Sequence, residues 1–397
     1  MPGSLPRVHL HIGLPKTGTT YLQEVLWHNR STAAAAGLLY PGYVHSAHFQ
    51  ASIDLQPGHY PDWHEPLVAG AWDRLAEQVR AWPGTSVISS ELLATATEEQ
   101  IDRALNSLSS AEVHIVCTAR DLARQIPSMW QENVRNRHVE GFAEFLAAIR
   151  GEQDSPLHDL FWRYQDLPRV LGRWAARVPA DRVHVVTLPH RGGSEAVLWQ
   201  RFTSVLGVEV SDLDTAPRYD NRGLGATDTE VLRRLNVALP SEVGWPQYAS
   251  VVKEYLAMKI LPRPGRHTRI TLPAADRAWV TDRAEAFVTH LTEAGYDLVG
   301  DLDELRPAAP PGSCVNAANA FVPSDGEMLD VAVDALAQLV RQMPANPDRD
   351  RPGERFKHSL REFSEAHPPV MALRELYWKS KAQMSWARGS NRRRPRS

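Results

Sequence analysis

The sequence VHLHIGLPKTGTTYLQEVL occupies residues 8–26 and predicts a strand, a turn and a helix, in that order. Apolar residues alternate over residues 8–12, which is typical of a buried strand, and the following turn contains Gly13 and Gly18. Apolar residues at helical spacing begin after Thr19, so we expect a helix to start there. A strand that leads through a glycine-containing turn into a helix indicates an α/β fold.

The turn and the start of the helix together predict an anion site. The first N–H groups of a helix have no partner inside the helix, and its dipole places partial positive charge at the same end. Lys16 adds a full positive charge to the turn. We therefore expect phosphate, or a close chemical relative of phosphate, to bind here.

The glycine spacing is close to that of the Walker A phosphate loop but does not match it. The Walker loop reads G-x-x-x-x-G-K-[ST], with lysine directly after the second glycine. Gly13 and Gly18 have the required separation, but Thr19 occupies the lysine position and Lys16 precedes Gly18 by two residues. Two alternatives stay open here: a turn that binds nothing, and a shifted phosphate loop of an enzyme that uses ATP.

A second motif follows another predicted strand. Residues 113–118 form a short apolar run, Arg120 comes directly after it, and Ser128 follows Arg120 by eight positions. Residues 127–135 are helix-like, with Pro127 expected in the first turn, where a missing N–H is tolerated. An arginine at a strand end and a serine on the next helix can bind one dianion together.

The two motifs resemble those of sulfotransferases that use 3′-phosphoadenosine 5′-phosphosulfate (PAPS). The sequence PKTGTT at residues 15–20 is similar to the 5′-phosphosulfate loop of that family. In the family, an arginine and a serine at the spacing of Arg120 and Ser128 hold the 3′-phosphate, which distinguishes PAPS from ATP. The resemblance covers about residues 7–300 in outline, while its specific motifs are much shorter.

The resemblance implies a cofactor site and a role for its residues. Lys16 would stabilise the bridging oxygen of PAPS, and Tyr21 would stack on adenine unless it only packs within its helix. Arg222 partially matches a loop that some members bring over the 3′-phosphate, with a solvated loop as the alternative. The cofactor-binding residues implied in this way are Pro15, Lys16, Thr17, Gly18, Thr19, Thr20, Tyr21, Arg120, Ser128 and Arg222.

The implied reaction moves the sulfuryl group of PAPS to a hydroxyl or amine of a carbohydrate, lipid or secondary-metabolite acceptor. A general base should remove the acceptor proton. Glu91 is the first candidate because it ends a predicted strand, and a salt-bridge or helix-start carboxylate is its alternative. His48 is the rival candidate, with a solvated loop histidine as the alternative. Tryptophans that could line an acceptor site, or merely pack, are Trp63, Trp130 and Trp162.

Two other functions fit the same motifs. One is an ATP-dependent kinase, in which Thr20 and Glu91 would hold Mg²⁺. The other is a catalytically inactive nucleotide-binding scaffold that lacks a working base. The sulfotransferase interpretation itself implies no metal, and the histidines show no spacing typical of a metal site.

The composition indicates which classes of binding partner and which cellular compartment to expect. The chain has 397 residues, and 44 basic against 47 acidic residues give a net charge of −3, which does not favour nucleic acid. The two cysteines, Cys117 and Cys314, are too few for a disulfide framework and favour a reducing compartment. Lacking an apolar run long enough to span a membrane, and with no predicted signal peptide, the chain is expected to be cytoplasmic.

Strands and helices alternate along the chain, which predicts a P-loop-NTPase-like parallel sheet flanked by helices. Between them, residues 37–42 are expected to form a turn-rich link and residues 47–70 to be irregular. Residues 1–305 would form the sulfotransferase domain, 306–387 a helical C-terminal extension and 388–397 a basic, disordered tail. The extension would cap the domain or form a homodimer contact. Its apolar residues expected to pack on a neighbour are Met328, Leu329, Val333, Leu336, Leu339, Val340 and Met343.

Overall fold

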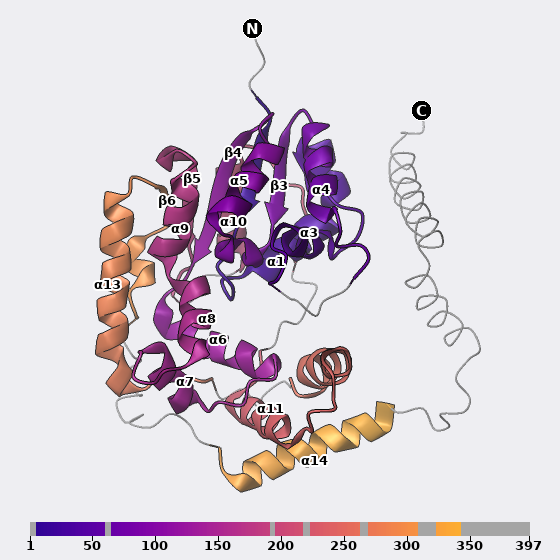
Figure 1. Ribbon diagram of the computed structural model, residues 1–397, viewed down its shortest axis with the longest axis vertical. Helices are drawn as coiled ribbons and strands as arrows, with labels where there is room; N and C mark the ends of the chain where they lie inside the picture. The colour runs from indigo at the N-terminus through magenta and orange to yellow at the C-terminus, as the bar shows by residue number, and fades with distance from the viewer. Residues whose placement is uncertain are drawn as a thin grey trace, which may run out of the picture.

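Six parallel strands form one sheet in the order β2-β3-β1-β4-β5-β6 in the computed structural model (Figure 1). The structure describes residues 5–59, 65–190, 195–216, 223–262, 269–308 and 323–342. The strands are β1 (Arg7–His11), β2 (Leu38–Leu39), β3 (Thr85–Ser89), β4 (Glu112–Ala119), β5 (Val183–Thr187) and β6 (Asp297–Val299).

Helices cover both faces of the sheet, which confirms the predicted α/β class. The α-helices of residues 5–190 are α1 (Thr19–His28), α2 (Arg30–Ala35), α3 (Ala47–Leu55), α4 (Ala71–Arg80), α5 (Glu98–Ser107), α6 (Leu122–Arg135), α7 (Phe142–Ile149), α8 (Pro156–Gln165) and α9 (Leu167–Ala175). Those that follow are α10 (Glu195–Leu206), α11 (Ala226–Ala238), α12 (Trp245–Gln247), α13 (Arg277–Glu293) and α14 (Asp325–Gln342). The shorter or wider helices are η1 (Glu91–Thr95), η2 (Ala180–Arg182), the π-helix η3 (Tyr248–Ile260), η4 (Ala274–Asp276) and η5 (Leu302–Leu305).

Alternate residues of each strand pack into different apolar clusters. On one face, Val8 and Leu10 of β1 join a cluster that includes α3, α4, α5 and α9. On the other face, Val116 of β4 and Val186 of β5 join a cluster with α1 and α10. Both faces of the sheet are covered, as expected for a parallel sheet, but the second face also carries polar side chains, among them His9 and His11 of β1 and His184 of β5.

The strand order places a divergence of connections between β1 and β4. From β1 the chain passes to β2 and β3 on one side of the sheet, whereas from β4 it passes to β5 and β6 on the other side. In open α/β sheets, ligands bind beyond the carboxyl ends of the strands at such a point. The loops after β1 and β4 are the segments that carry the two motifs of the sequence.

Three local predictions were wrong. Residues 47–70 were expected to be irregular, but they contain α3, whose buried face includes polar side chains that hid its periodicity. Pro127 was expected in a first turn, but α6 begins five residues earlier, where the Asp121 side chain accepts the Arg124 N–H as an N-cap. The expected link at residues 37–42 contains β2.

The C-terminal helix α14 packs on α11 and η3, and in Figure 1 α11 and α14 lie below α6. The expected apolar stripe is confirmed only in part, because Met328 is buried and Leu339 packs partly buried against the core, while the other buried residues of α14 are Val331 and Ala335. The remaining members that the structure describes are exposed: Leu329, Val333, Leu336 and Val340. The domain boundary at 305 stays a prediction, and residues 343–397, including the basic tail, lie outside the described residues. In the ranges that the structure describes, no helix is long and apolar enough to cross a membrane.

Candidate functional site

The loop after β1 is fastened to β4 by backbone hydrogen bonds. The Leu14 N–H donates to the Thr118 carbonyl at 2.7 Å, and the Thr118 N–H donates to the Gly13 carbonyl at 2.5 Å. The pairing of β1 with β4 therefore continues beyond His11, the last residue of β1. This places the loop against the end of β4, directly before Arg120.

A buried network of hydrogen bonds connects the loop to the strands beneath it in the sheet. The Thr118 hydroxyl lies 2.6 Å from the Thr17 hydroxyl and 3.2 Å from Nε2 of His11, whose Nδ1 lies 2.8 Å from the Ser89 hydroxyl. Burial lowers the pKa of His11 to about 3, so its ring is neutral. The Thr17 hydroxyl also donates to the Leu14 carbonyl, so its proton is used within the fold. A ligand would therefore meet Thr17 through its backbone N–H.

The start of α1 has the features of an anion site. Gly18 is the N-cap residue, in the left-handed conformation with φ of 84°, and has no side chain to cap the first N–H groups. Thr19 is buried and Thr20 is exposed, so the two predicted ligands differ in accessibility. The positive end of the helix dipole lies at the same place.

Lys16 lies in a cationic cluster around one carboxylate. Its Nζ donates to Oε2 of Glu132 at 3.0 Å, while Arg135 and Lys253 lie 3.3 and 3.8 Å from the same carboxylate. Burial alone would raise the pKa of Glu132, but Lys16, Arg135 and Lys253 outweigh it and lower the pKa to about 2. Three cations against one anion leave an excess of positive charge at the loop.

Arg120 and Ser128 are in direct contact, as their spacing predicts. Nη2 of Arg120 donates to the Ser128 hydroxyl at 2.8 Å and to the Arg124 carbonyl at 2.7 Å. Nε of Arg120 is buried and has no hydrogen-bond partner among the described residues. Burial, with the neighbouring charge of Arg124, lowers the pKa of Arg120 to about 10, so the guanidinium stays charged at neutral pH.

One face of α6 links the two motifs. The Gln125 side chain donates to the Pro15 carbonyl, Ser128 contacts Arg120, and Glu132 binds Lys16. These three residues of α6 follow the helical repeat and so share a face. Ser128 and Glu132 are about one turn apart, which corresponds to a rise of about 6 Å. Lys16 and Arg120 therefore lie against neighbouring turns of one helix.

Glu91 lies beside the loop. It is the first residue of η1, directly beyond β3, and Nε2 of Gln23 on α1 donates to its Oε2 at 3.3 Å. A Cβ atom added to Gly13 would be 3.0 Å from Cβ of Glu91, so the loop backbone passes against this residue. Gly13 also has a φ of 95°, which favours glycine for a second reason.

His48 is not the solvated loop histidine that was the alternative to a base. It lies in α3, only 4% exposed, and its ring stacks on Tyr40 at 4.1 Å. Its Nδ1 accepts the Ser89 N–H at 2.9 Å, so Nε2 carries the proton and donates to the Pro41 carbonyl at 2.7 Å. Burial lowers the pKa of His48 to about 4. Because both ring nitrogens are bonded to backbone groups, neither is free to accept a proton from an acceptor, which argues against His48 as a general base.

The other residues predicted to lie at the site, Tyr21, the three tryptophans and Arg222, differ in whether the structure describes them and in what they contact. The Tyr21 hydroxyl donates to the Thr215 carbonyl at 3.2 Å. Trp130 and Trp162 are buried and donate to backbone carbonyls, so they pack in the core and do not line an open site. Trp63 and Arg222 lie outside the described residues. Just after Arg222, the Leu224 carbonyl accepts a hydrogen bond from Gln131 of α6 at 2.6 Å.

Sequence reasoning missed Glu132, Gln125 and Thr118. The first two could have been found once Ser128 was placed on a helix, because Gln125 and Glu132 repeat on its face at three- and four-residue steps. Thr118 gave no signal, since its role depends on the register between β1 and β4. Sequence reasoning also missed three histidines that are far from one another in sequence but lie close together on the sheet, namely His9, His114 and His184.

Searches with this chain against protein-family models, curated proteins and solved structures gave no match. The assignment of a function therefore depends on the residues and their geometry.

Replacement of Gly18 by alanine should disturb the loop. The new Cβ would lie 2.4 Å from Cδ2 of Leu198, and φ of Gly18 is 84°. We expect Gly18→Ala to lower the free energy of unfolding by about 1–2 kcal/mol, measured by urea denaturation. The matched control is Gly172→Ala, which has open space inside α9 and should raise it by about 0.5–1 kcal/mol. Equal effects of both substitutions would contradict this account of the loop.

The Glu132 cluster predicts a pH-dependent stability. Because the folded pKa of Glu132 is lowered from 4.5 to about 2, its stabilisation is complete above pH 4.5 and is lost as the pH falls towards 2. We expect Glu132→Gln to lower the free energy of unfolding by about 1–3 kcal/mol at pH 7, and by less at pH 3. The exposed control Glu77→Gln should change it by under about 0.5 kcal/mol at either pH. A difference between wild type and Glu132→Gln that stays constant with pH would contradict the assignment.

Proposed function

We propose that this protein is a sulfotransferase that transfers the sulfuryl group of PAPS to a hydroxyl or amine of a small-molecule or glycan acceptor. The observation that carries the proposal is the placement of its two anion-binding motifs. The loop with Lys16 follows β1, Arg120 and Ser128 follow β4, and the chain diverges between these two strands. A P-loop-like identity for the fold is part of the same proposal.

Each end of the nucleotide would meet a different group of donors. The 5′-phosphosulfate would accept hydrogen bonds from the backbone N–H groups at the start of α1, near Lys16. The 3′-phosphate would bind Arg120 and Ser128, and the buried Nε of Arg120, which has no partner among the described residues, would gain one if the phosphate reached it. Since Lys16 and Arg120 lie against neighbouring turns of α6, one nucleotide could reach both.

The chemistry requires positioning and charge more than covalent participation by the protein. As the S–O bond breaks, negative charge develops on the 5′-phosphate oxygen, and Lys16 would stabilise it. Lys16 would then share its charge between this oxygen and Glu132. Glu132, ionised because its pKa is about 2, would hold the ammonium group at the loop before the nucleotide arrives.

Glu91 is the proposed general base. It follows β3 at the same edge of the sheet as the loop, and its contact with Gln23 fixes one carboxylate oxygen. Glutamate at this position could remove the acceptor proton as the acceptor oxygen attacks sulfur. An acceptor that supplies a hydroxyl, such as a carbohydrate or a secondary metabolite, would fit this chemistry.

Nucleotide binding tests the proposal directly. With a chelator present, adenosine 3′,5′-bisphosphate should bind the full-length protein more tightly than adenosine 5′-phosphate in titration calorimetry. Arg120→Gln should weaken bisphosphate binding by about 10–100-fold, because it removes charged hydrogen bonds, and should leave adenosine 5′-phosphate within about threefold. The control Arg163→Gln, on an exposed arginine of α8, should change neither affinity.

Other results would select the alternatives. Binding of ATP that requires Mg²⁺, with no preference for a 3′-phosphate, would replace the proposal with a kinase. Preference for the bisphosphate without transfer from PAPS to any acceptor in a broad panel would indicate an inactive nucleotide-binding protein.

The base assignment has its own test. Glu91→Gln should lower the turnover of sulfate transfer from labelled PAPS by about 10²–10⁴-fold, while the affinity for adenosine 3′,5′-bisphosphate stays the same. Glu77→Gln, an exposed carboxylate on α4, is the matched control and should keep full turnover. Unchanged turnover in Glu91→Gln would show that another group removes the proton.

A further inference from the structure

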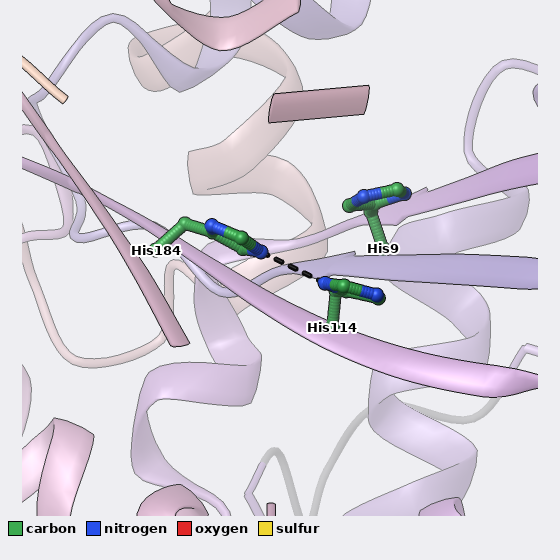
Figure 2. Close-up of side chains that lie close together, drawn as sticks. All are labelled: His9, His114 and His184. Atoms are coloured by element: carbon green, nitrogen blue, oxygen red, sulfur yellow. Dashed lines mark hydrogen bonds between the residues drawn. The ribbon is translucent and has the colours of Figure 1, made fainter. Parts of the chain in front are cut away.

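Three histidines from adjacent strands meet on one face of the sheet. His9 of β1 is in register with His114 of β4, and His184 of β5 pairs with Val116, two residues further along β4. The three side chains therefore point to the same side (Figure 2), and their ligand atoms all lie within 4.8 Å of one another. They lie nearer the amino ends of β4 and β5, away from the nucleotide loop.

His114 and His184 each contact a carboxylate, as histidines that bind metals commonly do. Nδ1 of His114 and Nε2 of His184 face each other at 2.8 Å, as the dashed line in Figure 2 marks. The outer nitrogens contact carboxylates: Glu112 at 3.0 Å from His114 Nε2, and Asp297 at 2.6 Å from His184 Nδ1. In metal sites, a carboxylate commonly accepts the second N–H of a ligating histidine and orients its ring.

The hydrogen bonds of these two rings need more protons than two neutral imidazoles carry. Glu112 and Asp297 each accept one N–H from their histidine, which makes two N–H groups. The contact between the two rings requires a third N–H. Two neutral rings supply only two N–H groups. The pair therefore needs one more cation, either a third proton or a metal ion between the facing nitrogens of His114 and His184. With a metal ion, both nitrogens would act as electron-pair donors.

His9 completes the set. It is 1% exposed, and neither ring nitrogen makes a hydrogen bond of normal geometry among the described residues, although the Val205 backbone lies close to the ring. At least one nitrogen therefore has no partner in the fold, and a metal ion would supply one.

The surrounding charges favour some metals over others. Glu112 and Asp297 are negative, but Arg7 and Arg182 lie 3.3 and 3.1 Å from Glu112 and offset its charge. Little net negative charge is left to attract a hard cation such as Ca²⁺ or Mg²⁺, which also prefers oxygen ligands. Affinity must come from the three imidazoles, which suit zinc and its neighbours in the first transition series.

We propose that His9, His114 and His184 bind one divalent zinc-type ion, with water at a fourth position. Metal–nitrogen bonds of about 2.0–2.1 Å in a tetrahedron place ligand nitrogens roughly 3.3 Å apart, so His114 and His184 would separate slightly and His9 would turn towards them. His114, with its side chain 13% exposed, lies nearest to solvent of the three and gives the ion access. The ion would join β1, β4 and β5, contrary to the sequence-based expectation of a metal-free protein.

The test is a titration of the full-length, tag-free, chelator-treated protein with Zn²⁺ in a calorimeter. We expect one equivalent to bind at the cluster. Asp297→Asn, at a half-exposed carboxylate that only orients His184, should weaken the affinity by about 10–100-fold, and His114→Gln should weaken it further. The controls are Asp181→Asn at the same end of the sheet and His158→Gln on α8, both of which should bind Zn²⁺ like wild type.

A second probe identifies the ligands. Co²⁺ in place of Zn²⁺ should give the visible absorption of a cobalt ion with imidazole ligands and low coordination number, and His114→Gln should abolish it. Absence of saturable Zn²⁺ binding in the wild type would overturn the proposal. Equal affinities in wild type, Asp297→Asn and His114→Gln would also overturn it, and Asp297→Asn keeps this outcome informative even if the His114 variant folds poorly.

Discussion

The backbone pairing of β1 with β4 continues past the end of β1, and the candidate site depends on it. The reciprocal bonds between Thr118 and the Gly13–Leu14 segment hold the loop at the carboxyl end of β4. They bring Lys16 to α6, because α6 begins just after the loop that follows β4. Without this register, the two motifs would be separate turns with no common ligand.

The parts of the fold and site that the sequence predicted are those decided by local spacing. The strand, turn and helix over residues 8–26 are confirmed. Arg120 and Ser128 are in contact because the end of a strand and the next helix lie close together, while their binding of a dianion stays a prediction. The parallel sheet was predictable for the same reason, because βα units repeat along the chain.

The parts that the sequence did not predict depend on contacts between distant segments. Nothing near His48 in sequence indicates that the N–H of Ser89, 41 residues away, would donate to its Nδ1. The carboxylate partner of Lys16 lies 116 residues away at Glu132. Ligand spacing along the chain could not show the cluster of His9, His114 and His184 either, because strand register alone brings these residues together.

The central strands β1 and β4 thus carry chemically different candidate sites at their two ends. At the carboxyl ends, excess positive charge around Lys16 and the start of α1 favours an anion. Towards the amino ends, three imidazoles, two of them beside carboxylates, favour a cation. Because His9 and His11 are both on β1 with β4 beside them, an ion bound at the histidines would fix the strand pair that supports the nucleotide loop. Metal bound at one end would then act on the loop at the other through the backbone pairing of β1 with β4.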